Sequence, residues 1–269
     1  MLTLTVLGSG SSGNAAVVSN GRTTVLVDAG LSAKQLSLRL SQVGYSLEQI
    51  DAVLLTHEHL DHCRGIAVLS RQRELQLYAN ALTREAMSRS LEGAKVRWNV
   101  MTNSVPFELG DLQVECFAVP HDAADPVGFV IGDGHSRLGL VSDLGHSNRL
   151  IETRLSQCHG LFVEANYDRA LLEADEVRPW ATKQRISSPH GHLSNEQAAG
   201  LIASLAHSHL RQVVLGHLSD DCNRPELAVD FVRRALADTV ARHARVQCAA
   251  RHEPTPSISL APLQVSIGS

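Results

Sequence analysis

The 269-residue sequence is poor in aromatic residues, which make up 4% of it. Proteins that bind single-stranded nucleic acid through rows of stacking rings need more, so the composition disfavours that mode of binding. Basic residues are not in excess either, because 24 Lys and Arg stand against 28 Asp and Glu and give a net charge of −4. A strongly basic surface for non-specific DNA binding is therefore excluded, while a local basic patch beside an active site remains open.

Paired cysteines and long apolar segments are also missing. The five cysteines are scattered and form no CxxC pair, which argues against a disulfide framework and a thiolate zinc site. No apolar run approaches the roughly 18 residues of a membrane span. The opening residues, MLTLTVLGSGSSGN, lack the basic start of a secretory signal peptide. We therefore expect a cytoplasmic protein that does not enter the membrane.

Short apolar segments bounded by glycine alternate with segments of helical periodicity. Strands are predicted at residues 2–7, 15–19, 23–27, 52–55, 75–79, 96–100, 112–118, 128–131, 138–141, 161–163 and 213–215. Helices are predicted at residues 33–43, 82–91, 194–207 and 225–241. No linker or change in composition divides the chain, so we expect one domain over residues 1–269, with sheets sandwiched between helices. A weak internal repeat is compatible with this order.

Histidine is abundant, with 14 residues, and several of them share one motif. The segment THEHLDH, residues 56–62, places three histidines and an aspartate directly after an apolar strand. Imidazole and carboxylate groups are common ligands of zinc, manganese and iron. A solvated polar loop is the alternative interpretation, but HxHxDH rarely follows an apolar strand by chance. The sequence therefore predicts a metal site that contains His57, His59, Asp61 and His62.

HxHxDH is the signature of the metallo-β-lactamase superfamily, which the sequence resembles over nearly its whole length. Further landmarks of that family follow in order, each at the carboxyl end of a predicted strand: Asp28, His121, Asp143 and His217. The resemblance implies an α/β fold, the four-layer αββα sandwich of two mixed sheets flanked by helices. It also implies a hydrolase with two divalent metal ions.

The family pattern divides the metal ligands into two groups of three and one bridging carboxylate. These correspond to His57, His59 and His121, to Asp61, His62 and His217, and to Asp143. Asp28 would orient a ligand by a hydrogen bond. Two ions roughly 3.5–4 Å apart can share a hydroxide that acts as the nucleophile. Zinc is the expected metal, with manganese or iron(II) as alternatives, because all three accept these ligands.

Two further residues resemble the phosphodiesterase branch of the superfamily, which includes RNase Z-like and RNase J-like nucleases. In that branch a glutamate orients a histidine that protonates the leaving oxygen, and Glu164 and His192 match in position and order. A general acid suits phosphodiester cleavage because the leaving alkoxide is poor without a proton. We therefore expect Glu164, His192 and the metal ligand Asp61 to be catalytic. For His192 alone, a surface loop histidine is the simpler alternative.

Longer stretches resemble the YycJ/WalJ group of bacterial proteins, which are regarded as 5′-to-3′ exonucleases acting on DNA. The matching segments include GSGSSGN, VDAGLS, PHDAADPVGF, GHLSNEQAA and HLSxxxNxPELA. One departure is EANYD in place of the expected ESNHD, so that Ala165 and Tyr167 replace serine and histidine. The resemblance implies a dinuclear DNA exonuclease. Alternatives are a phosphodiesterase for small substrates such as cyclic nucleotides, a thioester or lactam hydrolase, a di-iron oxidoreductase, and a scaffold with structural metals.

Candidate phosphate contacts surround the ligand motifs. They are Ser11, Asn14, Arg64, Lys183, Arg185 and Arg224. Arginine forms paired hydrogen bonds to phosphate, although any one of these side chains could be a solvated surface charge. As a group they favour a polyanionic substrate, which the resemblance identifies as a nucleic acid and specifically DNA. A homodimer is compatible with the sequence.

Overall fold

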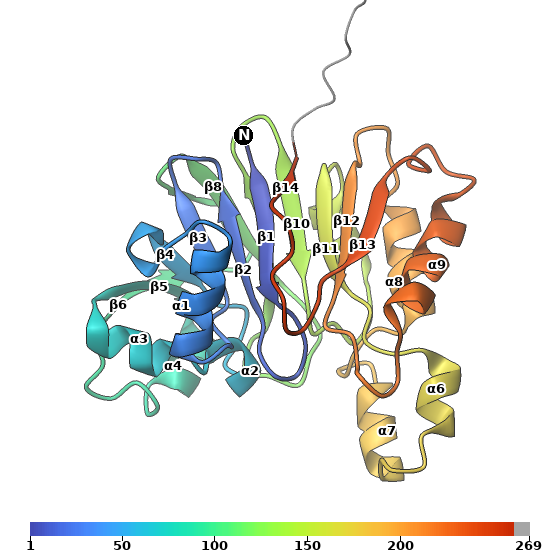
Figure 1. The fold of residues 1–269 in the computed structure, drawn as a ribbon, viewed down its shortest axis with the longest axis horizontal. Coiled ribbons are helices and arrows are strands. Elements are labelled where there is room, and N and C mark those ends of the chain that lie inside the picture. Colours follow the sequence, from blue (N-terminus) through green and yellow to red (C-terminus); the bar gives the residue numbers. More distant parts are fainter. Residues whose placement is uncertain (261–269) are drawn as a thin grey trace, which may run out of the picture.

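The computed structural model describes residues 1–260, which form two mixed sheets packed face to face between two layers of helices (Figure 1). The first sheet has the order β14 (Ile258–Ser259), β1 (Thr3–Gly8), β2 (Ala15–Ser19), β3 (Thr24–Val27), β4 (Ala52–Leu54), β5 (Leu75–Asn80) and β6 (Val96–Met101). The second has the order β13 (Arg245–Cys248), β12 (Gln212–Gly216), β11 (Gly160–Glu164), β10 (Arg137–Val141), β9 (Val127–Gly132), β8 (Leu112–Ala118) and β7 (Phe107–Leu109).

Each sheet is covered by helices from its own part of the chain. The first sheet packs against α1 (Ala33–Gln42), α3 (Ile66–Gln72) and α4 (Ala81–Met87), and the second against α5 (Arg149–Leu155), α8 (Asn195–Ser204) and α9 (Pro225–Leu236). Shorter elements are η1 (Leu47–Gln49), α2 (Leu60–Cys63), α6 (Arg169–Ala174) and α7 (Trp180–Ile186). The expected four-layer αββα sandwich is confirmed.

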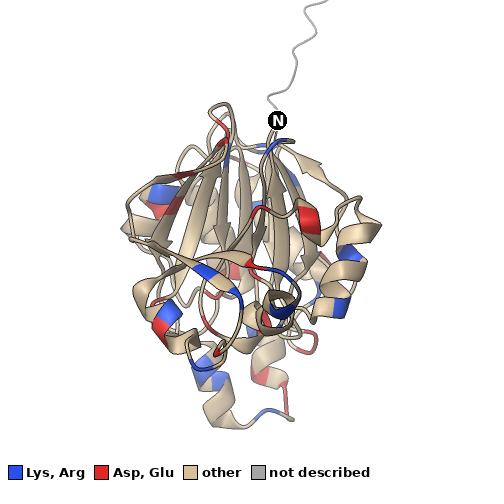
Figure 2. Ribbon diagram, turned by 90° about the vertical axis from the view of Figure 1, so that its left-hand side faces the viewer, with Lys and Arg blue, Asp and Glu red and all other residues tan. Residues whose placement is uncertain are grey.

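Apolar side chains fill the three spaces between these layers. Phe129 lies between the sheets, Leu36 beneath the first helix layer and Val232 beneath the second, and all three are fully buried. Lys and Arg are interspersed with Asp and Glu, mainly on the helices and loops (Figure 2). Within residues 1–260, no helix is long and apolar enough to cross a membrane. The last part of the predicted single domain, residues 261–269, lies outside the described residues.

The two sheets share one arrangement of strands. In the first sheet β14 to β3 are antiparallel neighbours and β3 to β6 are parallel. In the second sheet β7 to β10 are antiparallel and β10 to β13 are parallel. Asp28 follows β3 and Asp143 follows β10, at matching places. The two halves of the structure thus repeat one strand arrangement, which the sequence indicated only as a possible weak internal repeat.

Predicted and observed elements agree well for strands and less well for helix ends. Every predicted strand is present, with ends that differ by at most one residue. The helix predicted at 82–91 ends at Met87, that at 194–207 ends at Ser204, and that at 225–241 ends at Leu236. In the last case Thr239 caps the end, because its hydroxyl and its N–H both donate to the carbonyl of Leu236 at 2.8 and 2.9 Å. Apolar periodicity therefore overestimated the helix lengths.

Candidate active site

Several site residues lie where the carboxyl ends of strands from both sheets meet at one edge of the sandwich. Asp28, Asp143 and His217 follow β3, β10 and β12, and they have positive φ angles of 60°, 52° and 54°. Such angles cost a non-glycine residue roughly 1–3 kcal/mol and persist only where the surrounding structure enforces them. The three residues share this conformation at the ends of three separate strands. This indicates that the backbone there is constrained to bring their side chains into the site.

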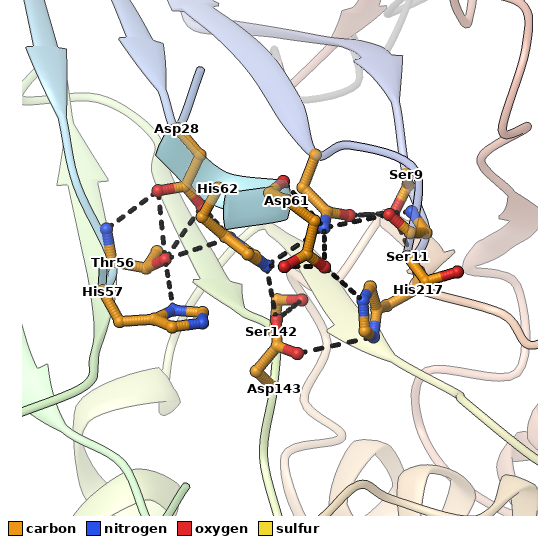
Figure 3. Close-up of polar contacts among 12 residues, drawn as sticks. Ser9, Ser11, Asp28, Thr56, His57, Asp61, His62, Ser142, Asp143 and His217 are labelled. Carbon is orange, nitrogen blue, oxygen red and sulfur yellow. Dashed lines mark hydrogen bonds and ion pairs between the residues drawn. The ribbon is translucent and has the colours of Figure 1, made fainter. Parts of the chain in front are cut away.

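The predicted ligands converge in one cluster, part of which Figure 3 shows. Four overlapping groups have donor atoms within 4.8 Å of one another: His57, His59 and His121; His57, His62 and Asp143; Asp61, His62 and His217; and Asp143, Glu164, His192 and His217. The structure therefore brings together all seven residues of the predicted ligand set. Asp143, like His57, His62 and His217, belongs to two of these groups, and its bridging position stays a prediction.

Two buried nitrogen atoms in the cluster have no hydrogen bond to any residue within 1–260. They are Nε2 of His57 and Nε2 of His217, and the latter faces Oδ2 of Asp61 at 3.5 Å. Most buried polar atoms in proteins are hydrogen-bonded, so two such atoms in one cluster call for an explanation. Imidazole nitrogens and carboxylate oxygens are also the donor atoms that divalent transition metals accept. The residues present therefore fit divalent metal ions.

The charges in the cluster favour a cation. Burial opposes charge on His217, but the carboxylates of Asp143, Asp61 and Glu164 together outweigh it and raise the pKa of His217 to about 10. Burial also opposes charge on His62, yet Asp143 and Asp28 raise the pKa of His62 well above its usual value. Burial, followed by His62, lowers the pKa of His57. Protons and metal ions compete for such nitrogens, so metal binding by this cluster must weaken as the pH falls.

Asp28 and Thr56 contact the Nδ1 atoms of two rings of the HxHxDH motif, His62 and His57 (Figure 3). Oδ2 of Asp28 lies 2.7 Å from Nδ1 of His62, and Oδ1 accepts the N–H of Thr56 at 2.9 Å. The hydroxyl of Thr56 lies 3.0 Å from Nδ1 of His57. With both Nδ1 atoms engaged, Nε2 of each ring is the atom left for the cluster. Thr56 is a contributor that the sequence prediction omitted.

Three other supporting residues were also missed. The amide nitrogen of Asn166 donates to the carbonyl of His217 at 2.8 Å, and the N–H of His217 donates to Oγ of Ser9 at 2.7 Å. The Ser142 hydroxyl donates to Oδ2 of Asp143 at 2.8 Å. Ser9 lies in the GSGSSGN segment and Asn166 in EANYD, two segments that the resemblance had already marked. The partner of both residues, His217, is far away in the sequence, so the contacts themselves could not be predicted.

Glu164 and His192 form a tight pair beside the cluster. Oε1 of Glu164, which is fully buried, lies 2.6 Å from Nδ1 of His192, and Oε2 accepts the N–H of Leu144 at 2.7 Å. Burial opposes charge on His192, but the Glu164 carboxylate outweighs it and raises the pKa of His192. The His192 side chain is 19% exposed. The pair can therefore hold a proton on a ring that still reaches solvent.

Asn14, one of the predicted phosphate contacts, lies against the HxHxDH motif. It is buried, its Nδ2 lies 3.0 Å from Nε2 of His62, and its Oδ1 accepts the N–H of Gly10 at 2.8 Å. Its backbone N–H donates to the carbonyl of Asp61 at 2.7 Å. Asn14 thus ties the glycine-rich loop to the metal motif through polar atoms that are engaged inside the protein, and its phosphate contact stays a prediction.

Arg185, Ser11 and Arg64 lie near the cluster or the glycine-rich loop. Nε of Arg185 is 2.6 Å from Oδ2 of Asp122, the neighbour of His121. Ser11 accepts a hydrogen bond from Arg251 at 2.5 Å, and Arg64 donates to a carbonyl of the same loop at 3.2 Å. These exposed side chains remain candidates for substrate contact.

Lys183 and Arg224 contact other parts of the second half. Nζ of Lys183 donates to the carbonyl of Glu173 at 2.9 Å, which joins α7 to α6. The Arg224 guanidinium donates to the carbonyl of Asp220 at 3.2 Å, just before α9. The role of both residues in substrate binding stays a prediction.

Gly30 allows the early loops to pack against the metal motif. A Cβ atom there would lie 1.6 Å from the carbonyl oxygen of Asp61 and 2.8 Å from the backbone nitrogen of Asn14. Both neighbours are backbone atoms and cannot move aside as a flexible side chain would. Close approach, rather than a positive φ, therefore requires glycine at this position.

We expect Gly30→Ala to lower the free energy of unfolding by at least about 1–3 kcal/mol, the usual range for overpacking. Urea denaturation would measure the change. Gly200→Ala is the matched control, because a Cβ on this helical glycine meets nothing within 4 Å. It should leave stability equal or raise it by up to about 1 kcal/mol. Equal stability of the Gly30→Ala variant and the wild type would contradict this packing.

Comparison with known proteins agrees with this geometry. Residues 23–218 match the family described as the beta-lactamase superfamily domain. Exodeoxyribonuclease WalJ of Streptococcus pneumoniae serotype 2 is 35% identical, over 83% of this chain and 84% of its own. Exodeoxyribonuclease YycJ of Bacillus anthracis is 33% identical, over 88% of this chain and 90% of its own. The metallo-β-lactamase fold protein YhfI of Bacillus subtilis has a TM-score of 0.71 at 17% identity, over 94% of this chain and 98% of its own.

Proposed function

Because the chain belongs to the metallo-β-lactamase superfamily and is homologous to exodeoxyribonucleases, we propose that it is a dinuclear metal-dependent DNA exonuclease that degrades from the 5′ end. The observation that carries the proposal is the Glu164–His192 pair beside the ligand cluster. A thioester has a thiolate leaving group, which departs without a proton and so needs this pair less than a phosphodiester does. The free cysteines among the described residues also suit a cytoplasmic location.

Seven residues of the cluster would hold the metals. His57, His59 and His121 would bind one ion, and Asp61, His62 and His217 the other, with Asp143 between them. When bound, two divalent ions supply a water of lowered pKa and positive charge for the oxygens that gain electrons. We propose zinc, with manganese or iron(II) as alternatives, because the donor set accepts all three.

His192 would supply the proton for the leaving oxygen. Its contact of 2.6 Å with Glu164 fixes a proton on Nδ1 and turns Nε2 outward. The raised pKa keeps the ring protonated to a higher pH than a free imidazole. As the O–P bond breaks, Nε2–H can pass its proton to the departing alkoxide, and the ring then takes up another proton from solvent. Asp61, on the other side of the cluster, would contribute as a ligand and not as an acid.

The proposed function is tested with end-labelled DNA. Protein of known metal content is incubated with single- and double-stranded DNA labelled at the 5′ or the 3′ end, beside RNA and bis(p-nitrophenyl) phosphate. Release of mononucleotide from the 5′ label at the earliest times supports the proposal. Early release from the 3′ label would overturn the polarity. Hydrolysis of only the small diester would overturn the nuclease assignment.

We expect Asp28→Asn to weaken metal binding by roughly tenfold to a hundredfold, the usual effect of losing a group that orients a metal-bound histidine. An amide still approaches Nδ1 of His62, but it no longer supplies the negative charge that lies 2.7 Å away. Competition with a chromophoric chelator measures the affinity. Asp111→Asn is the control, because that carboxylate forms an exposed ion pair with Arg22. Equal affinities of the Asp28 variant and this control would contradict the role of Asp28.

A further inference from the structure

The hairpin formed by α6 and α7 projects from the lower edge of the sandwich (Figure 1). It lies between Glu164 and His192 in the sequence and carries an exposed tryptophan, Trp180, whose relative exposure is 70%. Beside the hairpin is a cleft of about 320 Å³, lined by residues that include Tyr167, Arg169, Trp180 and Lys183. Tyr167 is one of the two residues, with Ala165, that depart from the expected ESNHD segment. The nuclease chemistry described above does not use this cleft.

The two sides of α7 connect the cleft with the active site. Trp180, Lys183 and Gln184 are spaced at i, i+3 and i+4, so they share one face of the helix, and all three line the cleft. On a different face, Arg185 lies 2.6 Å from Asp122, which is next to the proposed ligand His121. One helix thus separates the edge of the metal cluster from an indole and an ammonium group.

The cations of the cleft are available to a ligand. The nearest carboxylate of Arg169 is that of Glu196, at 3.5 Å, and both side chains are about half exposed or more, at 63% and 48%. Exposed pairs of this kind contribute little and are readily exchanged. Lys183 donates to the backbone carbonyl of Glu173, so this contact does not neutralise its charge, and with Glu173 also in the lining the cleft has two cations and one acidic residue. Two cations beside an exposed indole are the combination that binds a nucleotide of a single strand, by stacking and phosphate contact.

We infer that this cleft binds the substrate strand beyond the active site, with one base stacked on Trp180 and the adjoining phosphate paired with Lys183 and Arg169. The inference rests on the proposed function and adds a second contact region to it. A single stacking position agrees with the low aromatic content, which disfavours only rows of rings. Substrates that are too short to reach the hairpin would gain nothing from the cleft.

The first test compares substrate lengths. For each variant, kcat/KM on dT12 is divided by kcat/KM on the dinucleotide pTpT. Trp180→Ala should lower this ratio about tenfold, within the range for loss of one stacked base. Trp98→Phe is the control, since Trp98 lies in β6 on the first sheet and should retain the wild-type ratio. An unchanged ratio in Trp180→Ala, with active wild type, overturns the inference and leaves the proposed function intact.

The second test does not depend on catalysis. The chain has two tryptophans, so Trp98→Phe leaves Trp180 as the sole indole fluorophore. In this background combined with His192→Ala, which slows turnover so that binding can be recorded first, titration with dT12 should quench and shift the emission of Trp180. Emission that stays constant at saturating dT12 overturns the inference. If the wild type cleaves no DNA but dT12 still quenches the emission, the proposed exonuclease activity is contradicted. The inference that the cleft binds a DNA strand is then supported independently.

Discussion

Replacing Asp143 with alanine is expected to lower metal content well below two ions per chain and to slow diester hydrolysis by on the order of a thousandfold or more. The Asp143 side chain is buried, with Oδ2 2.9 Å from Nε2 of His62. Its Oδ1 lies 3.6 Å from Nδ1 of His217 and 3.8 Å from Nε2 of His121. One carboxylate therefore faces ligands of both proposed ions, and its loss removes the anion that holds the two halves of the site together.

The measurement pairs elemental analysis of the purified variant with its rate on bis(p-nitrophenyl) phosphate. Asp133→Ala is a suitable control, because its carboxylate accepts the N–H groups of His135 and Ser136 in a turn away from the cluster. That variant loses two hydrogen bonds of a turn but should keep its metals. An Asp143→Ala protein that retained both ions and full activity would contradict the bridging role.

The strands and the metal cluster could be predicted from the sequence because both depend on local patterns. Apolar runs bounded by glycine defined the strands, and polar residues directly after them marked one edge of the sandwich. Asp28, Asp143 and His217 were assigned through the resemblance to the metallo-β-lactamase superfamily, whose landmarks they match at the ends of predicted strands, because each taken alone could be an ordinary polar residue. The alternation of antiparallel and parallel pairs, which makes the two sheets equivalent, depends on long-range pairing and was not visible in the sequence.

Apart from Thr56 and Ser142, which contact their neighbours His57 and Asp143, the supporting contacts could not be predicted because they join residues that are far apart in the chain. Ser9 meets His217 across 208 positions, and Asn14 meets His62 across 48. Residues 169–187 lacked a clear pattern because α6 and α7 have only six and seven residues, about two turns each. Two-turn helices depend on tertiary contacts, and here Leu172 packs with Tyr167 and Cys222 in a small separate core.

His192→Ala should reduce kcat on DNA by roughly a hundredfold to ten-thousandfold while the metal content stays at the wild-type level. The ring is not among the seven proposed ligands; it contacts Glu164 at 2.6 Å, and its Nδ1 is 3.7 Å from Oδ1 of Asp143. Removing it therefore takes away the proton donor without opening the cluster. His190→Ala is the matched control, since this exposed histidine lies two residues earlier in the same loop.

The identity of the leaving group separates an acid from a residue that merely binds or shapes the site. An alkoxide leaves poorly without a proton, whereas p-nitrophenolate is stable enough to leave without one. The effect of His192→Ala should consequently be much smaller on bis(p-nitrophenyl) phosphate than on DNA, and Glu164→Gln should show the same contrast because it weakens the hold on Nδ1. Equal losses on both substrates would contradict proton donation by His192, since a general defect of the site slows every substrate alike.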